Sequence, residues 1–423
     1  YKTGIRFEGW SRRAGFGSYF HPFATALDGH TQGDFFANAA ARRGGADVVA
    51  LPDRFYLPAW LAANRRAPIA PAHFPFEVSY GYHFDAHLVG AVLREYAVAS
   101  GVVHLERRIE SVALAENGDV RALIGEGGEE ITGDLFVDCS GFRALIAQQA
   151  LRVPFLSFGD NLFNDAAVVM PTPRDEAGIS PSTAAVAMAA GWRWHIPLTS
   201  RTGNGYVYAS RYLSADAAET ELRTALGLLD SDTPARHLKM KVGRVERSWE
   251  RNCLAVGLSQ GFIEPLEATA LHIVQASVEG FISAYQAGGF TAQHRGTFNT
   301  QIARRYDGIR DYIVGHYRLN QRGDTAYWRD NAGNQALSDS LKSLFTCWFT
   351  GGDMVAEVDR QKIGGYYAPL SWYCLFAGYG TFPDDARLQA VPDTGRMAAI
   401  DDFIGRCGGN FADHDVTLGA LGR

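Results

Sequence analysis

The chain has 423 residues, of which 47% are hydrophobic and 20% are charged, so a disordered or fibrous protein is excluded. Its length allows two or three modules or one large fold. The 40 basic and 46 acidic side chains give a net charge of −6, which argues against a nucleic-acid partner. Because no apolar stretch reaches the roughly 20 residues needed to cross a bilayer, we expect a soluble protein that needs no membrane.

The cysteines predict neither a disulfide framework nor a metal site. They are odd in number, widely scattered and never in C-x-x-C spacing. Such usage is typical of the reducing cytoplasm, which is the compartment we expect. The five positions are Cys139, Cys253, Cys347, Cys374 and Cys407.

The first residues read as a strand that is already under way. Ile5 and Phe7 alternate with charged residues, as in a half-buried strand. The segment 1–7 has the features of neither a signal peptide nor an initiator region, so we expect a preceding segment to be missing. A loop rich in glycine and aromatic residues is predicted over residues 15–25.

A helix and a β meander are predicted next. Asp85 is a candidate N-cap for a helix that ends at Gly101 and carries one apolar face. Four short β-type runs follow, separated by turn-forming residues, and the last of them leads into Asp138. The apolar face comprises Leu88, Val92, Leu93 and Tyr96, and the runs cover residues 102–105, 109–114, 120–124 and 135–137.

The rest of the chain completes a mixed α/β (α+β) pattern. Residues 184–208 read as further β structure, and residues 215–228 as a helix capped by Ser214. From about residue 300 the patterns become amphipathic and helical. We therefore predict a module over residues 1–300 and a mainly helical module over residues 301–423.

One strand motif singles out a candidate site. Trp192, Trp194 and Ile196 alternate, so they share one face of a strand that Pro197 ends. By itself this wall is better explained as a core face with two large aromatic side chains. Read as W-x-W-x-I-P after a glycine, however, the motif resembles the signature of flavin-dependent halogenases of the tryptophan-halogenase type.

Further segments extend this resemblance in order along the chain to about Tyr285. The run 262–270 resembles the family fingerprint F-x-x-P-x-S-x-G, with Ala268 and Ala270 in place of Ser and Gly. Residues 1–10 resemble the segment of the catalytic lysine, and residues 20–23 resemble a substrate-site loop. The runs 137–143 and 252–257 resemble segments that contact flavin. A complete G-x-G-x-x-G loop is missing, and the resemblance places it before Lys2.

The resemblance implies a fold and an activity. The fold would be an FAD-binding, Rossmann-like module of the aromatic-hydroxylase type with a mixed substrate sheet, followed by the helical module. The enzyme would use FADH2, O2 and chloride or bromide to make hypohalous acid, which halogenates an indole-like or tryptophan-like ring. A separate NAD(P)H-dependent flavin reductase would supply FADH2, and a homodimer is among the assemblies that this reading allows.

The same resemblance assigns roles around the ring that reacts. Lys2 would guide the oxidant, and Glu267 would accept the ring proton and stabilise the cationic intermediate. His21 and Phe23 would clamp the substrate, while Trp192 and Trp194 would separate it from the flavin. Simpler readings are a surface lysine at Lys2 and, at Glu267, a first-turn acid that favours the helix dipole.

A halide site and a cofactor site complete the expectations. Helical spacing over residues 267–285 predicts a helix whose first N–H groups, at Thr269 and Ala270, are free to bind an anion. The resemblance implies six residues at the cofactor: Asp138, Ser140, Gly141, Gly257, Pro265 and Leu271. The alternative functions are a flavin-dependent aromatic hydroxylase and a flavin-binding protein without activity.

Overall fold

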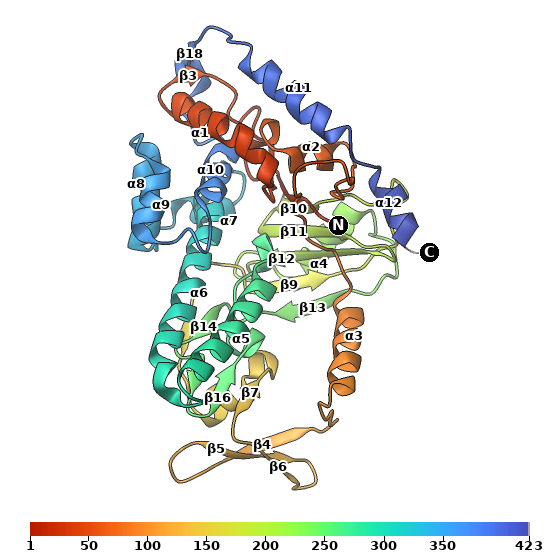
Figure 1. Cartoon of the computed structure of the whole chain (residues 1–423), viewed down its shortest axis with the longest axis vertical. Helices are drawn as coiled ribbons and strands as arrows, with labels where there is room; N and C mark the ends of the chain where they lie inside the picture. Colours follow the sequence, from red (N-terminus) through yellow and green to blue (C-terminus); the bar gives the residue numbers. More distant parts are fainter. Residues whose placement is uncertain (422–423) are drawn as a thin grey trace. The chain divides into compact units, whose positions relative to one another are not determined.

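The structure, a computed structural model, describes residues 1–421 as two compact units (Figure 1). The first unit comprises Tyr1–Asp85, Ala166–Leu238 and the chain from Val314 onward, and the second comprises Ala86–Asp165 and Lys239–Ile313. Helix α6 (Arg295–Arg318) contains the last boundary between these units. The two modules predicted from the sequence are continuous segments that meet near residue 300, whereas these units are each built from several segments. The predicted modules therefore stay a prediction.

A seven-stranded mixed sheet forms the centre of the first unit, in the order β13-β9-β12-β11-β10-β1-β2. Strand β1 pairs parallel with β10 and antiparallel with β2. The strand predicted around Ile5 and the β structure predicted over residues 184–208 are both confirmed. The strands are β1 (Gly4–Glu8), β2 (Ser18–Pro22), β9 (Ala166–Val169), β10 (Thr183–Met188), β11 (Gly191–Pro197), β12 (Thr202–Tyr208) and β13 (Arg236–Lys239).

The predicted loop over residues 15–25 is wrong in its middle, where strand β2 lies. Gly15 and Gly17 precede the strand, and the run Ser18–Pro22 pairs with all of β1. The reason is that Tyr19, Phe20 and His21 suit a pleated surface, and the edge of β1 gives their backbone groups hydrogen-bond partners. The glycines therefore mark only the turn that leads into the strand.

Helices cover the sheet of the first unit. Helix α10 is buried from Trp372 to Gly378, and it lies so close to β2 that a Cβ on Gly378 would be 2.3 Å from the Tyr19 ring. The helix at residues 215–228 is confirmed as α4, and the Ser214 side chain caps it by accepting from Ala217 N–H. The helices of this unit are α1 (Gly29–Arg43), α2 (Leu57–Ala63), α4 (Ala215–Leu226), α7 (Ala326–Gly333), α8 (Asp339–Phe349), α9 (Met354–Gln361), α10 (Pro369–Gly378), α11 (Arg396–Gly408) and α12 (His414–Leu421). A two-stranded pair, β3 (Ala46–Asp47) with β18 (Gln389–Ala390), completes the unit.

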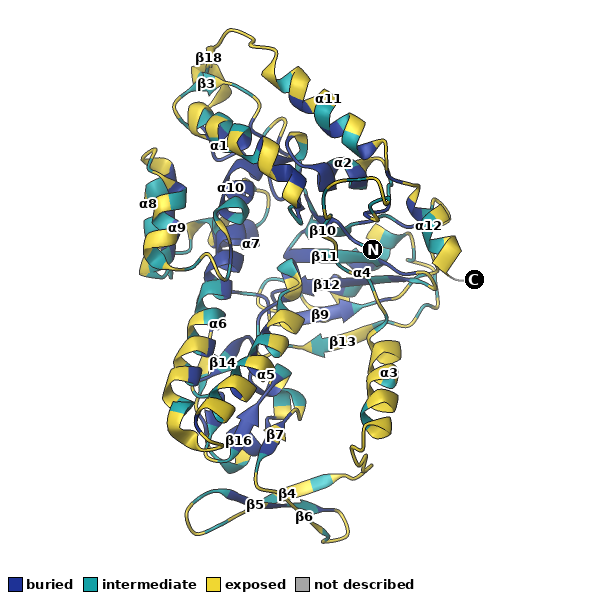
Figure 2. Ribbon diagram, in the orientation of Figure 1, coloured by how far each residue is buried: buried dark blue, intermediate teal, exposed yellow. Residues whose placement is uncertain are grey.

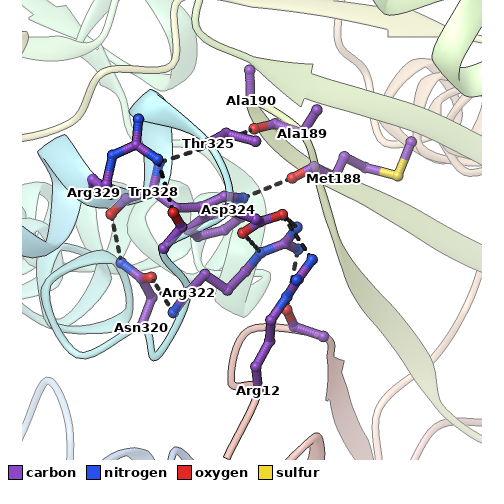
Figure 3. A network of polar contacts seen from close by, with 12 residues as sticks. Arg12, Met188, Ala189, Ala190, Asn320, Arg322, Asp324, Thr325, Trp328 and Arg329 are labelled. Atoms are coloured by element: carbon purple, nitrogen blue, oxygen red, sulfur yellow. Dashed lines mark hydrogen bonds and ion pairs between the residues drawn. The ribbon is translucent and has the colours of Figure 1, made fainter.

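A polar network fastens α7 to the turn between β10 and β11 (Figure 3). Trp328 Nε1 donates to the carbonyl oxygen of Met188 (2.8 Å), and Thr325 Oγ1 donates to that of Ala189 (2.8 Å). Asp324, just before the helix, accepts from both Arg12 and Arg322. The network fixes the start of β11, the strand that carries the W-x-W motif.

The second unit combines small sheets with three helices. Strand β7 ends at Asp138 and pairs parallel with β16, whereas β4, β5 and β6 form a separate antiparallel sheet. The runs predicted at 109–114, 120–124 and 135–137 are strands, but β6 was not predicted and the last run does not join the meander. The strands are β4 (Ile109–Leu114), β5 (Val120–Gly125), β6 (Glu130–Thr132), β7 (Phe136–Asp138), β8 (Phe155–Ser157), β14 (Gly243–Val245), β15 (Trp249–Glu250), β16 (Cys253–Ala255) and β17 (Gly261–Phe262). The helices are α3 (Ala86–Ala99), α5 (Ala270–Ala287) and most of α6.

The predicted apolar helix is present as α3, but its apolar face is open. None of its residues is buried (Figure 2). Leu88 and Tyr96 are 68% and 73% exposed. The strand expected at residues 102–105 is absent, because this segment finds no strand to pair with in the part of the chain that the structure describes. The helical periodicity thus predicted the helix correctly, but it did not predict whether the apolar face would be buried.

Within residues 1–421, no helix combines the length and the apolar character that a membrane crossing requires. All five cysteines are free thiols.

Candidate functional site

The site residues predicted from the sequence fall into two groups, one in each compact unit. Five residues lie in the first unit: Lys2, His21, Phe23, Trp192 and Trp194. Nine lie in the second unit: Asp138, Ser140, Gly141, Gly257, Pro265, Glu267, Thr269, Ala270 and Leu271.

Lys2 is buried just before strand β1. The residue is only 7% exposed, and its Nζ lies 5.2 Å from the centre of the Phe23 ring. Its backbone forms an antiparallel bridge with Gly81. A surface lysine is therefore excluded, whereas the role of its amine in catalysis stays a prediction.

His21 lies near the end of β2, and Phe23 directly follows the strand and contacts Lys2. His21 is 8% exposed, and its Nε2 is 3.2 Å from the Ser371 hydroxyl of α10. The Phe23 N–H donates to the carbonyl oxygen of Thr3, which continues the pairing with the β1 segment beyond the strand. The sequence did not single out Ser371, because its closeness to His21 depends on the packing of α10.

The two tryptophans form the predicted wall on β11. Trp192 is buried, Trp194 is half-buried, and their ring centres are 6.2 Å apart. Trp194 lies opposite Gly205 of β12, where a Cβ would be 2.0 Å from the indole. The absence of a side chain at Gly205 therefore leaves the space that the indole occupies.

The sheet register brings the two motifs of the first unit to one face. Cross-strand partners point to the same side of a sheet. Trp194 pairs with Ala185, which pairs with Phe7, and Phe7 pairs with Tyr19 on β2. Since His21 is two residues beyond Tyr19 on the same strand, it shares this face with the tryptophan wall.

A histidine that the sequence did not single out also lies in this region. His83 Nε2 is 3.0 Å from the Thr183 hydroxyl, and its Nδ1 is buried without a hydrogen-bond partner. Burial, and secondly the positive charge of Lys2, lower the pKa of His83 from 6.5 to about 3. His83 is consequently a neutral imidazole at neutral pH. The pattern Gly81-Tyr82-His83 carries no local signal for this placement.

In the second unit, the predicted halide residues lie at the start of α5. The 18-residue helix begins at Ala270, so the N–H groups of its first turn have no partner within the helix. Thr269 precedes it, and its hydroxyl oxygen is buried without a hydrogen-bond partner. Ala268 has φ +56°, a left-handed conformation, whereas Ala270 is helical and unstrained. Ala270, which stands where the fingerprint F-x-x-P-x-S-x-G has its glycine, therefore causes no backbone strain.

Three predicted residues line a single apolar pocket of about 190 Å³. Gly257 and Ala270 border it, and so does Leu271, which is 62% exposed. Gly257 has φ +68°, which favours glycine. Pro265 begins the short turn that leads into α5, and Glu267 ends this turn. The remaining wall residues are Leu258, Gly261, Phe262, Ile263, Ile273, Val274 and Tyr306.

Asp138 organises the loop that follows β7. Its carboxylate accepts hydrogen bonds from Ser140 N–H (3.0 Å), Ser140 Oγ (2.6 Å), Ile146 N–H (2.9 Å) and Ala147 N–H (2.8 Å). Gly141 has φ +73°, as a sharp turn requires. The carboxylate therefore holds the shape of this loop, and contact of the loop with a cofactor stays a prediction.

Glu264, which directly precedes the turn into α5, is buried. Its carboxylate accepts from Asn164 Nδ2 at 2.9 Å. Among residues 1–421, no group of three or more His, Cys, Asp and Glu side chains could hold a metal ion.

Known proteins share this architecture. The structure of tryptophan 6-halogenase SttH from Streptomyces toxytricini matches 99% of this chain and 85% of its own, with a TM-score of 0.82 at 33% identity. BrvH, a flavin-dependent halogenase from Brevundimonas sp. BAL3, matches the same shares with a TM-score of 0.82 at 32% identity. The mixed α/β fold class expected from the sequence is therefore confirmed.

The sequence comparisons agree with the structural ones. The family model for tryptophan halogenases matches residues 1–393, so the chain belongs to this family. It is 41% identical to the 7-chloro-L-tryptophan 6-halogenase KtzR of Kutzneria sp. (strain 744) over 323 residues, which are 75% of this chain and 61% of KtzR. It is 36% identical to SttH over 420 residues, which are 93% of this chain and 79% of SttH. The chain thus spans about three fifths of the length of KtzR.

Proposed function

We propose that the protein is an FADH2-dependent halogenase of an electron-rich aromatic substrate, indole-like or tryptophan-like. Membership of the tryptophan halogenase family supports the class of reaction. The observation that carries the proposal is the burial of Lys2 against an aromatic ring, next to the strand that bears His21. An amine in such a place can meet a small diffusing oxidant while bulk water is kept away.

The second unit offers surfaces that suit a flavin. The apolar pocket beside Gly257 and Leu271 fits part of a planar ring system, and the exposed Leu271 side chain would gain from being covered. The loop held by Asp138 presents Ser140 and Gly141 as further contacts. When bound, reduced FAD and O2 would oxidise chloride or bromide to hypohalous acid.

The start of α5 would hold the halide. First-turn N–H groups attract anions, and the buried hydroxyl of Thr269 is a further donor without a partner. Because Ala270 adopts ordinary helical angles, its N–H is available in the same way as that of a glycine. The site needs no positively charged side chain.

Lys2 and Glu267 would act on the oxidant and on the ring. The Lys2 ammonium would donate a hydrogen bond to hypohalous acid and so make its halogen more electrophilic. Glu267 would accept the proton that the ring loses and would stabilise the positive charge before that loss. His21 and Phe23 would hold the ring, and Trp192 and Trp194 would separate it from the flavin.

We also propose the conditions under which the enzyme works. A separate NAD(P)H-dependent reductase would supply FADH2, and the cytoplasm would be the compartment. The free thiols of all five cysteines support a reducing environment.

The test is a product assay with the full chain, FAD, NADH, a flavin reductase, bromide or chloride, and indole or tryptophan. A product with the halogen isotope pattern supports the proposal. A product heavier by one oxygen indicates an aromatic hydroxylase instead, and no product above background indicates a flavin-binding protein without activity.

Variants then test Lys2. We expect Lys2→Met to lower halogenation by at least 100-fold while FAD binding is unchanged. Lys342→Met is the matched control, because Lys342 lies on the surface in an ion pair with Asp339. Normal halogenation by Lys2→Met would overturn the assigned role.

A further inference from the structure

Gly81 lies directly opposite Lys2, although the two residues are far apart in the sequence. The Lys2 N–H donates to the carbonyl oxygen of Gly81 (2.9 Å), and the Gly81 N–H donates to that of Lys2 (2.8 Å). Such a reciprocal pair fixes the separation and the relative direction of the two backbones. The position of the lysine backbone therefore depends on the segment around Gly81.

The side chain of Lys2 lies over this glycine. A Cβ built on Gly81 would be 3.3 Å from Lys2 Cγ, 3.6 Å from Lys2 Cε and 3.2 Å from Phe23 Cε2. Ordinary contacts between carbon atoms are about 3.5–4.0 Å, so any side chain at this position would push the lysine stem and the Phe23 ring outward. Gly81 has no positive φ, so a side chain here is opposed by its neighbours and not by its backbone.

The Phe23 ring connects this contact to the ammonium group. The same ring that closes over Gly81 lies 5.2 Å from Lys2 Nζ, within the range of a cation–π interaction. The stem, the ring and the glycine thus form one packed unit, which we call the Lys2 cradle: Lys2, Phe23 and Gly81. A shift of one member moves the other two.

We propose that Gly81 is a positioning residue for Lys2: by leaving out a side chain, it sets where the ammonium lies. This inference rests on the proposed role of Lys2 in guiding the oxidant. A displaced ammonium would still leave hypohalous acid to be made, but more of it would escape before it meets the ring. The expected defect is therefore lost coupling between the oxidant and the product.

The test uses the graded variants Gly81→Ala and Gly81→Val in the full chain. The first readout is the NMR signal of Lys2 in protein labelled with 13Cε-lysine, which is tractable because the chain has only five lysines, at positions 2, 239, 241, 342 and 362. The Lys2 signal is assigned by its loss in Lys2→Met. The second readout is halogenated product formed per FADH2 consumed, with escaped hypohalous acid trapped by a chlorinatable dye. Gly33→Ala is the control, since a Cβ there meets nothing within 4 Å.

We expect the Lys2 signal to move in both Gly81 variants, while the other four lysine signals stay in place. Product per FADH2 should fall about threefold to tenfold with alanine and about 100-fold with valine. An unmoved Lys2 signal in both variants, or full coupling in Gly81→Val, overturns the inference. If the signal moves but Lys2→Met still halogenates normally, the cradle stands and the proposed role of the amine fails.

Discussion

Replacing Gly205 by alanine is expected to displace Trp194, the outer member of the tryptophan wall. The new Cβ would be 2.0 Å from Cζ2 and 2.2 Å from Cη2 of the indole. Since carbon atoms in contact are about 3.5–4.0 Å apart, the ring must retreat by roughly 1.5–2 Å. The indole cannot make this shift without leaving its place on β12.

The size of the effect follows from two opposing contributions. Overpacking of this kind typically costs about 1–3 kcal/mol. Alanine in place of glycine recovers about 0.4–1 kcal/mol by restricting the unfolded chain. The net loss of stability should be about 1–2 kcal/mol, which lowers the midpoint of thermal unfolding by about 1–2 °C in a chain of 423 residues.

The assay is thermal unfolding followed by circular dichroism, with Gly203→Ala as the matched control. Gly203 lies on the same strand and face, but the nearest atom to its Cβ is the Ile196 carbonyl oxygen at 3.6 Å, so its substitution should be neutral. A double-mutant cycle with Trp194→Ala completes the test, because removal of the indole should abolish the cost of the Gly205→Ala change. If the two changes add within about 0.5 kcal/mol, the steric argument is refuted.

Three further outcomes are expected. The pKa of His83 is about 3 in the folded protein and 6.5 in the unfolded chain, so between these values the unfolded chain binds one more proton. The free energy of unfolding is therefore highest above pH 6.5 and falls as the pH falls, by about 2 kcal/mol at pH 5. Urea midpoints of the natural protein should therefore drop more between pH 7.5 and pH 5 than those of His83→Gln, and equal drops contradict the assignment. Thr269→Val should leave the unfolding midpoint unchanged or slightly higher, but it should raise the halide concentration that gives half-maximal rate several-fold. Thr269→Ser keeps the hydroxyl and should therefore require the same halide concentration as the natural protein. Asp138→Ala should lower the free energy of unfolding by about 2–4 kcal/mol, because the amides of Ile146 and Ala147 lose their acceptor. Fluorescence titration should also show weaker FAD binding. An unchanged midpoint of urea unfolding would contradict the structural role of this carboxylate.

Local signals explain what the sequence could predict. The period-two pattern placed Trp192, Trp194 and Ile196 on one face of a strand, and β11 has this form. Helical spacing predicted a helix over residues 267–285, and α5 runs from Ala270 to Ala287. These patterns depend on residues that are neighbours in the chain, so they are visible without the fold.

Only the tertiary structure decided which of these elements meet and what they enclose. Lys2 is buried because Gly81 and Phe23 pack against it from other parts of the chain, while α3, equally apolar on one face, stays open. The contact of Trp194 with Gly205 depends likewise on the register between β11 and β12. Burial and strand register arise from partners distant in sequence, and a local pattern contains no record of them.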